Sequence, residues 1–227
     1  MEKTKKLVIF GIGETGRMFY NCFQHDSEYE VCAFTVEDDF RTTDEYRGLP
    51  VVRFAEIEDH FSPEEYEMFV AIVSTNMNTL RKRIYSECKA KGYKLATYIS
   101  SKASVGYEVE IGENCAVMEN TSIQQFAKIG DDVIIFSNNV IGHSSEIRNH
   151  VFISSCIAMS GYCKIGESCF LGVNCTLNVG VVVGDYCYIG MATVIEKDVP
   201  DFTLIKAEPS KPYKRSTKQL YGLKMGE

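Results

Sequence analysis

The sequence lacks the features that are typical of membrane-spanning, nucleic-acid-binding and zinc-binding proteins. Its longest apolar run near the N-terminus, Leu7 to Ile12, stops at Glu14 and is too short for a membrane span or a signal-peptide core. The net charge is −7 and no basic cluster is large enough to neutralise many phosphates, which argues against duplex nucleic acid as a partner. None of the nine cysteines forms a C-x-x-C pair, the spacing of many zinc and redox sites. We therefore expect a cytoplasmic chain without a membrane span, long enough for one large domain or two modest ones.

The sequence does contain a long repeat with a period of six residues. From Ile99, every sixth residue is aliphatic over seventeen consecutive places: Ile99, Val105, Ile111, Val117, Ile123, Ile129, Ile135, Ile141, Ile147, Ile153, Met159, Ile165, Leu171, Leu177, Val183, Ile189 and Ile195. The fourth residue after each of these is mostly small. A period of six fits neither a helix nor a flat strand over so long a run. It indicates a solenoid of five to six coils, in which three short strands make each triangular turn of about 18 residues.

In such a solenoid the aliphatic residue and the small residue both point inward. Five cysteines occupy the small inward position: Cys115, Cys163, Cys169, Cys175 and Cys187. Cysteine in this place acts as a compact apolar residue, so we predict that these five are structural rather than redox or metal groups. Cys156 lies outside this phase.

The segment before the repeat has a different pattern. The stretch "KKLVIFGIGETGRMFYNCF" is an apolar strand, then Gly11-Ile12-Gly13-Glu14-Thr15-Gly16, then a predicted helix. G-x-G-x-x-G between a strand and a helix is a candidate phosphate-cradling loop, and Glu37 follows at the distance of a ribose-binding carboxylate. The alternative interpretation is that the glycines serve only close packing of the helix on the strand. We predict a small Rossmann-like unit over residues 1–96, a repeat domain over 97–200 and a C-terminal tail over 201–227.

The repeat resembles the hexapeptide-repeat, left-handed β-helix acyltransferases. A short Rossmann-like domain directly before it is similar to the bacterial nucleotide-amino-sugar acetyltransferases, a group that includes sialic-acid O-acetyltransferase-like proteins. The phrases "GYKLATYISSKASV", "MSGYCKIGESCFLGVNCTL" and "VVVGDYCYIGMATVIEKDVP" carry the resemblance, which covers nearly the whole chain. The expected fold is therefore an α/β Rossmann-like domain followed by an all-β, left-handed parallel β-helix.

The resemblance also implies that the two domains bind different substrates. The N-terminal domain is expected to hold a nucleotide-linked sugar, and the β-helix to bind acetyl-CoA between neighbouring subunits of a homotrimer. The residues implied for the sugar nucleotide are Gly11, Gly13, Glu14, Gly16, Glu37, Asn76, Asn78, Arg81 and Asn138. Those implied for acetyl-CoA are Ser160, Gly161, Val173, Met191 and Lys206.

His143 is the candidate catalytic base. It follows the inward Ile141 by two places, so its side chain is predicted to point out of the coil. "IGH", followed about a coil later by Ser160-Gly161, matches the family's active-site phrase, and the family's base falls on His143. Gly161 lies 18 residues after His143, on the same corner, where its small size is expected to leave room for a thioester. The alternative interpretation is a solvated surface histidine.

The sequence departs from the family pattern around this histidine. Many relatives have an acidic residue beside the base, whereas the neighbours here are Gly142 and Ser144. Glu146 or Asn138 is the candidate substitute. His150 is interpreted as a surface or subunit-interface residue. Two histidines on the repeat are too few for the three-histidine zinc site of β-helix carbonic anhydrases, so no metal is predicted.

The predicted activity is transfer of acetyl from acetyl-CoA to the amine of a nucleotide-linked deoxyamino sugar, for a surface polysaccharide such as lipopolysaccharide O-antigen or another glycan. O-acetylation of a sugar hydroxyl is the first alternative. The second is a non-catalytic protein that binds a nucleotide sugar or CoA, and a nicotinamide-dependent oxidoreductase comes last.

Overall fold

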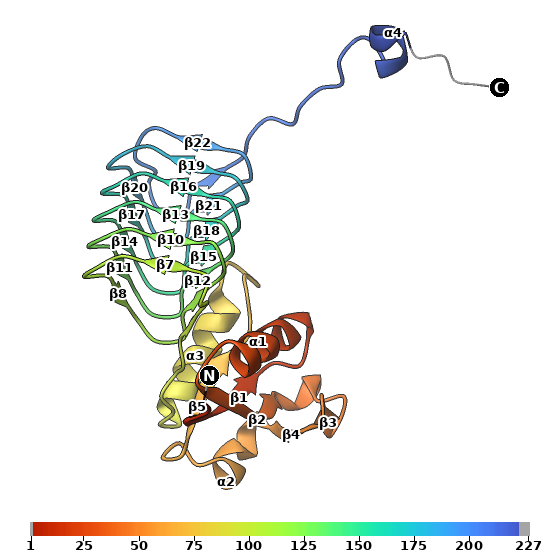
Figure 1. The fold of residues 1–227 in the computed structure, drawn as a ribbon, viewed down its shortest axis with the longest axis vertical. Helices are drawn as coiled ribbons and strands as arrows, with labels where there is room; N and C mark the ends of the chain where they lie inside the picture. The colour runs from red at the N-terminus through yellow and green to blue at the C-terminus, as the bar shows by residue number, and fades with distance from the viewer. Residues whose placement is uncertain (1, 223–227) are drawn as a thin grey trace, which may run out of the picture.

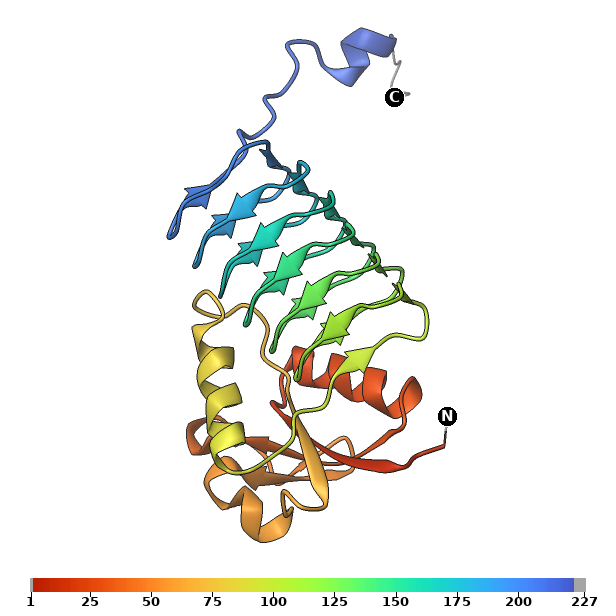
Figure 2. The same ribbon diagram turned by 90° about the vertical axis from the view of Figure 1, so that its left-hand side faces the viewer.

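The computed structural model describes residues 2–222, which form an α/β domain, a β-helix and a C-terminal tail (Figure 1). The α/β domain lies at one end of the β-helix, and the tail leaves from the other end (Figure 2). The predicted fold, an α/β domain followed by a left-handed parallel β-helix, is confirmed.

The N-terminal domain is built on a mixed five-stranded sheet in the order β3-β4-β2-β1-β5. Its strands are β1 (Lys5–Phe10), β2 (Tyr29–Val36), β3 (Glu45–Tyr46), β4 (Leu49–Arg53) and β5 (Tyr66–Val70). All are parallel except β3, which pairs with β4 in the antiparallel sense. The carboxyl ends of β1, β2 and β5 therefore meet at one edge, where an open α/β sheet usually binds its ligand.

Helices cover both faces of this sheet, which explains why its central strands are almost entirely apolar. They are α1 (Glu14–His25), η1 (Asp38–Phe40), η2 (Phe54–Glu56), α2 (Ile57–His60) and α3 (Thr79–Ala90). On one face, Phe19 and Phe23 of α1 pack on Phe69 of β5. On the other face, Ile84 of α3 belongs to the same buried cluster as Val8 of β1.

The β-helix has three flat faces, each a ladder of two-residue parallel strands. Face 1 consists of β6 (Tyr98–Ile99), β9 (Ala116–Val117), β12 (Ile134–Ile135), β15 (Phe152–Ile153), β18 (Phe170–Leu171), β21 (Tyr188–Ile189) and β23 (Leu204–Ile205). Face 2 consists of β7 (Ser104–Val105), β10 (Ser122–Ile123), β13 (Val140–Ile141), β16 (Ala158–Met159), β19 (Thr176–Leu177) and β22 (Val194–Ile195). Face 3 consists of β8 (Glu110–Ile111), β11 (Lys128–Ile129), β14 (Glu146–Ile147), β17 (Lys164–Ile165) and β20 (Val182–Val183). We name the three corners edge 1–2, edge 2–3 and edge 3–1 after the faces that they join.

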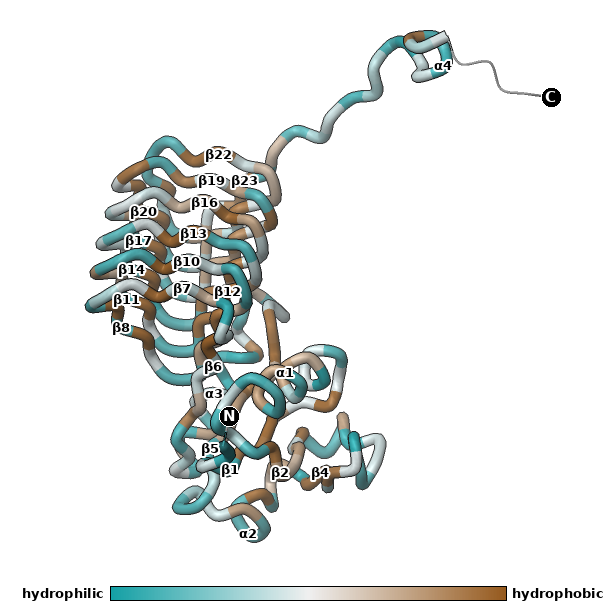
Figure 3. Tube along the Cα trace, in the orientation of Figure 1, coloured by the Kyte–Doolittle hydropathy of each residue, from teal (hydrophilic) through white to brown (hydrophobic). Residues whose placement is uncertain are grey.

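The coils stack in the register that the repeat predicts. Ile123 pairs with Ile141, and Ile141 pairs with Met159, each 18 positions further along the chain. From Val117 to Ile195 every sixth residue is buried, and the apolar strand positions stand out along the coils in Figure 3. Ile99 and Val105 are instead 40% and 39% exposed, because the first coil has no coil below it.

The five inward cysteines are completely buried in this core. Burial raises the pKa of the Cys115, Cys169 and Cys175 thiols to about 12, because a thiolate there would lose its hydration. The prediction that they are structural is therefore supported by their surroundings, whereas Cys156 is exposed.

The coil continues further than the sequence predicted. The repeat was expected to end at residue 200, but β23 pairs with β21 and adds a last strand to face 1. The hexad spacing is lost after Pro200, so the period gave no sign of this strand. Beyond β23 the chain runs away from the β-helix to α4 (Thr217–Tyr221). A capping box at Ser216 stabilises the N-terminus of this helix. Within residues 2–222, no helix combines the length and apolarity needed to cross a membrane.

The two domains are joined by a buried polar network at edge 3–1. The Arg81 side chain of α3 is fully buried, and its Nε donates to Asp132 Oδ1 at 3.0 Å. Asp132 Oδ2 lies 2.8 Å from Nδ1 of His150, one coil further along the same edge. Asn114 donates to Asp132 Oδ1 at 2.7 Å and accepts from the backbone N–H of Val70 in β5. The N-terminal domain thus packs on face 1 and edge 3–1. His150 is buried at this junction between the domains, which corrects the prediction that it lies on the surface or at a subunit interface.

Candidate functional site

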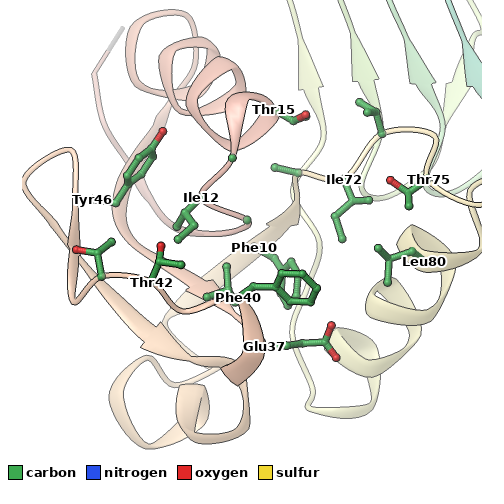
Figure 4. A pocket seen from close by; sticks show the side chains of 16 residues that line it. Phe10, Ile12, Thr15, Glu37, Phe40, Thr42, Tyr46, Ile72, Thr75 and Leu80 are labelled. Atoms are coloured by element: carbon green, nitrogen blue, oxygen red, sulfur yellow. The ribbon is translucent and has the colours of Figure 1, made fainter.

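A cavity of about 540 Å³ opens at the carboxyl ends of β1, β2 and β5 (Figure 4). The loops that follow these three strands and the first turn of α3 supply its walls. Its lining is mainly apolar, with threonine hydroxyls and one carboxylate among the apolar groups: Phe10, Gly11, Ile12, Gly13, Thr15, Val36, Glu37, Phe40, Thr42, Thr43, Tyr46, Ala71, Ile72, Val73, Thr75 and Leu80. A pocket of this composition suits a ligand that has both flat apolar parts and hydrogen-bonding groups.

The glycine-rich loop contributes to the cavity in two different ways. Gly11 and Gly13 line it, and Gly13 is the N-cap of α1, whose first turn therefore faces the opening. Gly16 does not line it. A Cβ on Gly16 would lie 2.1 Å from the carbonyl oxygen of Gly11, so this glycine is needed for close packing of α1 on the loop. The packing interpretation therefore holds for Gly16, whereas Gly11 and Gly13 lie at the cavity where the other interpretation expects a phosphate.

Glu37, directly after β2, lines the margin of the cavity, where the sequence predicted a ligand carboxylate, and its side chain is directed toward α3. Both of its oxygens accept from Arg83 of α3, at 3.0 Å each. These hydrogen bonds with Glu37 raise the pKa of Arg83, so the guanidinium stays charged and holds the carboxylate in one orientation.

Five other residues predicted to bind the substrate do not line this cavity. Glu14 is exposed and pairs with Arg17, and Asn76 is exposed in the loop before α3. Arg81 and Asn78 are completely buried, and Asn78 donates to the carbonyl oxygen of Cys169 at 3.0 Å. These two side chains join the domains and have no surface left for a ligand.

The fifth, Asn138, lies exposed on edge 1–2 of the β-helix.

The sequence reasoning missed residues on the other wall of the cavity, namely Phe40, Thr42, Thr43 and Tyr46. A signal for them existed, because they follow β2, and loops after parallel strands gather at the ligand edge.

His143 lies on edge 2–3, exposed to solvent, as its place in the repeat predicted. Its backbone N–H donates to Oε1 of Gln124, one coil earlier, at 3.0 Å. Its imidazole lies directly over Gly161, since a Cβ added there would be 2.7 Å from Nε2. The space left by Gly161 is therefore occupied by the histidine ring, whereas the sequence analysis expected it to admit a thioester.

No carboxylate orients this imidazole among the hydrogen bonds and ion pairs that we find within residues 2–222. The nearest polar partner of Nδ1 is Oγ of Ser144, at 3.5 Å, which is too long for a strong hydrogen bond. Glu146 projects from face 3 and Asn138 lies on edge 1–2, so neither takes the place of the missing acidic neighbour.

The residues predicted to bind acetyl-CoA divide between two edges. Ser160 and Gly161 lie beside His143 on edge 2–3. Val173 and Met191 lie on edge 1–2, where they are 46% and 71% exposed. Lys206 is next to them, because it packs against the turn at Gly190. Face 2 separates the two groups within one chain.

Comparisons with known proteins agree with both halves of this description. The PglD N-terminal domain family matches residues 6–88, and the hexapeptide repeat of succinyl-transferase matches residues 162–197. The acetyltransferase domain of PglB from Neisseria gonorrhoeae FA1090, which has also been solved with acetyl coenzyme A, is 27% identical, with a TM-score of 0.80 over 92% of this chain and 100% of that chain. PerB from Caulobacter crescentus, in complex with CoA and GDP-perosamine, is 27% identical, with a TM-score of 0.78 over 88% of this chain and 92% of that chain. Comparison with curated protein sequences finds no match.

These matches support an acyltransferase, as predicted, in a chain that has hexapeptide repeats and an N-terminal segment similar to the PglD N-terminal domain. Its neighbours of known structure include sugar acetyltransferases. WeeI from Acinetobacter baumannii AYE, 18% identical at a TM-score of 0.66, shares the fold. The sialic-acid subtype stays a prediction.

Proposed function

We propose that the protein transfers acetyl from acetyl-CoA to the amine of a nucleotide-linked amino sugar, with His143 as the general base, in the synthesis of a surface glycan. The observation that carries the proposal is the exposed imidazole held over Gly161 on the β-helix, in a chain that also has a ligand cavity in a PglD-type domain. Neighbours of this fold have been solved with acetyl-CoA, and with CoA together with a nucleotide-linked amino sugar, which supports both substrates.

The cavity has the parts that a sugar nucleotide needs. Free backbone N–H groups at the start of α1, next to Gly13, suit the negatively charged diphosphate. The carboxylate of Glu37, fixed by Arg83, suits the hydroxyls of the ribose. Phe40 and Tyr46 provide apolar walls for the flat base.

The proposed reaction needs one proton acceptor and no enzyme nucleophile. The neutral sugar amine attacks the carbonyl carbon of the thioester, so a C–N bond forms and the oxygen becomes an oxyanion. His143 accepts the proton that the amine loses, and a backbone N–H near Gly161 is the candidate donor to the oxyanion. When the oxyanion collapses, the C–S bond breaks and CoA leaves as a thiolate, which takes up a proton. The products are the acetamido sugar and free CoA.

A single chain does not bring these parts together. The N-terminal domain covers face 1 and edge 3–1, whereas His143 lies on edge 2–3, the edge opposite face 1. Val173, Met191 and Lys206 lie on the third edge. We therefore infer a homotrimer in which one chain's edge 2–3 meets surfaces of another, so that each active site is shared between subunits.

Face 2 is the surface best suited to this contact. Its outward strand positions are uncharged and mostly small: Ser104, Ser122, Val140, Ala158, Thr176 and Val194. Face 3 instead carries alternating charges at these positions, such as Glu110 and Lys128, which form an exposed ion pair at 3.0 Å. Val194 is 69% exposed in the isolated chain, as expected of a face that a second copy covers.

The test is release of free CoA thiol from acetyl-CoA in the presence of UDP-, dTDP- and GDP-linked amino sugars, each beside its hydroxyl counterpart. We expect turnover with one amino sugar and loss of at least about 100-fold in kcat for His143→Ala. Turnover that survives His143→Ala overturns the assignment of the base. Turnover with hydroxyl sugars only changes the product from an amide to an ester. Binding of acetyl-CoA without thiol release from any sugar identifies a binding protein instead.

A further inference from the structure

Tyr162, on the same edge as His143, has a backbone conformation that large side chains rarely adopt. Its φ is 61°, in the left-handed region, and the equivalent place one coil further along is Gly180. The tyrosine is 58% exposed. The same backbone conformation recurs at this place in other turns of the β-helix, for example at Phe126 and Tyr186, so the feature that distinguishes Tyr162 is its contact with His143.

Both the backbone and the ring of Tyr162 contact the candidate base. The backbone N–H of Tyr162 donates to the carbonyl oxygen of His143 at 2.9 Å. The two rings lie 4.8 Å apart between centroids and cross at 83°, in an edge-to-face arrangement. This is a favoured geometry for aromatic pairs, and it limits rotation of the imidazole.

A carboxylate that orients a histidine ring is present in this chain, but on another edge than His143. Asp132 lies 2.8 Å from Nδ1 of His150, and both side chains are buried at the domain junction. At His143 the nearest oxygen, Oγ of Ser144, is 3.5 Å away. The ring of His143 is therefore fixed mainly by its two packing neighbours, Gly161 below it and Tyr162 beside it.

We propose that Tyr162 is a positioning residue for His143: its aromatic ring orients the imidazole, as a carboxylate does beside other histidine bases. The proposal rests on the proposed function, since it assigns a role in that same site. The ring, and not the hydroxyl, makes the contact, so phenylalanine should replace tyrosine and alanine should not.

Three variants test this assignment. Tyr162→Ala removes the ring and Tyr162→Phe keeps it. Phe126→Ala is the matched control, because Phe126 occupies the same position two coils earlier, with φ 65° and 50% exposure. For each variant, kcat and KM for acetyl-CoA and for the sugar nucleotide are measured with the thiol assay.

We expect Tyr162→Ala to lower kcat by about 10-fold or more, with both KM values within about 3-fold of wild type. Tyr162→Phe should recover most of this loss, and Phe126→Ala should keep the wild-type kcat. A rise in KM at unchanged kcat would show that Tyr162 binds substrate, and equal losses in the Phe and Ala variants would assign the effect to the hydroxyl. Either result overturns the proposal.

A measurement that does not need activity separates this proposal from the proposed function. The ring protons of His143, assigned by comparison with His143→Ala, should change NMR chemical shift in Tyr162→Ala because the ring current of the neighbouring aromatic is lost. They should not change in Phe126→Ala. If wild type transfers no acetyl group, the proposed function fails while these shifts still test the packing. Unchanged shifts in Tyr162→Ala overturn the positioning role.

Discussion

Gly161→Ala offers the sharpest test of how edge 2–3 is built around His143, the proposed base. The added methyl carbon would lie 2.7, 2.9 and 3.0 Å from Nε2, Cε1 and Cδ2 of His143. Carbon atoms in ordinary contact are about 3.5–4.0 Å apart, so the imidazole has to move by about 1 Å. A displacement of that size at a reacting group costs about 100-fold in rate, or about 2.7 kcal/mol in the barrier.

The same substitution should leave the fold intact. The backbone of Gly161 is not in the left-handed region, so alanine fits its conformation. The three atoms nearest to the added carbon all belong to the exposed side chain of His143, which can shift toward solvent. We expect the free energy of unfolding to change by less than about 0.5 kcal/mol, as for ordinary surface substitutions. Thermal unfolding measures this part of the prediction.

A double-mutant cycle shows whether the effect acts through the histidine. With thiol release as the assay, Gly161→Ala should lower kcat by about 100-fold in wild type but by less than about 3-fold in the His143→Ala background. An unchanged kcat for Gly161→Ala in wild type would refute the geometry of the edge. A loss of similar size in both backgrounds would show that the methyl group obstructs the thioester instead, as the sequence analysis expected.

Three further predictions concern the scaffold. Asp132→Asn breaks a fully buried ion pair and should lower the free energy of unfolding by about 3–5 kcal/mol in urea titrations, whereas Glu110→Gln, in an exposed pair, should change it by less than about 1 kcal/mol. A thiol reagent should modify Cys156 in the native protein and the inward cysteines only after unfolding, and peptide mapping identifies the modified residues. Rapid labelling of the inward cysteines in the native protein would contradict their burial. Burial raises the pKa of Tyr29 and Tyr98, so each keeps its proton in the folded state after the unfolded chain begins to lose it near pH 10. The melting temperature should therefore be insensitive to these groups below pH 10 and fall as the pH rises further, and a rise there would contradict the sign.

The β-helix could be predicted residue by residue because its contacts are periodic. Residues 18 positions apart pair directly, as Ile123 does with Ile141, so the sequence itself contains the map of neighbours. The side-chain direction of His143 and its position next to Gly161 followed from the same arithmetic. The period failed only where the repeat stops, at β23.

The N-terminal domain has no repeat from which its contacts could be deduced, so the predictions for it were less complete. Gly11, Gly13 and Glu37 were found because a motif and a strand end indicate them. Arg81 was expected to bind the sugar nucleotide from the family resemblance, together with Asn76 and Asn78 of the same polar loop. Its partner Asp132, however, lies 51 positions away in the other domain. A contact between domains leaves no pattern in either segment alone, so burial of Arg81 was not predictable from its neighbours in sequence.

The two histidines of the β-helix differ in their surroundings, which separate the proposed base from a structural side chain. The period places Asp132 directly before His150 on edge 3–1, so the sequence did contain the sign of a histidine–carboxylate pair. That pair is buried beside Arg81, where no substrate reaches it. His143 has glycine one coil further along and is exposed to solvent, and the proposed base needs this exposure in order to meet a thioester and an amine. In this chain the carboxylate partner marks the histidine that holds the domains together, and solvent exposure marks the histidine that we propose as the base.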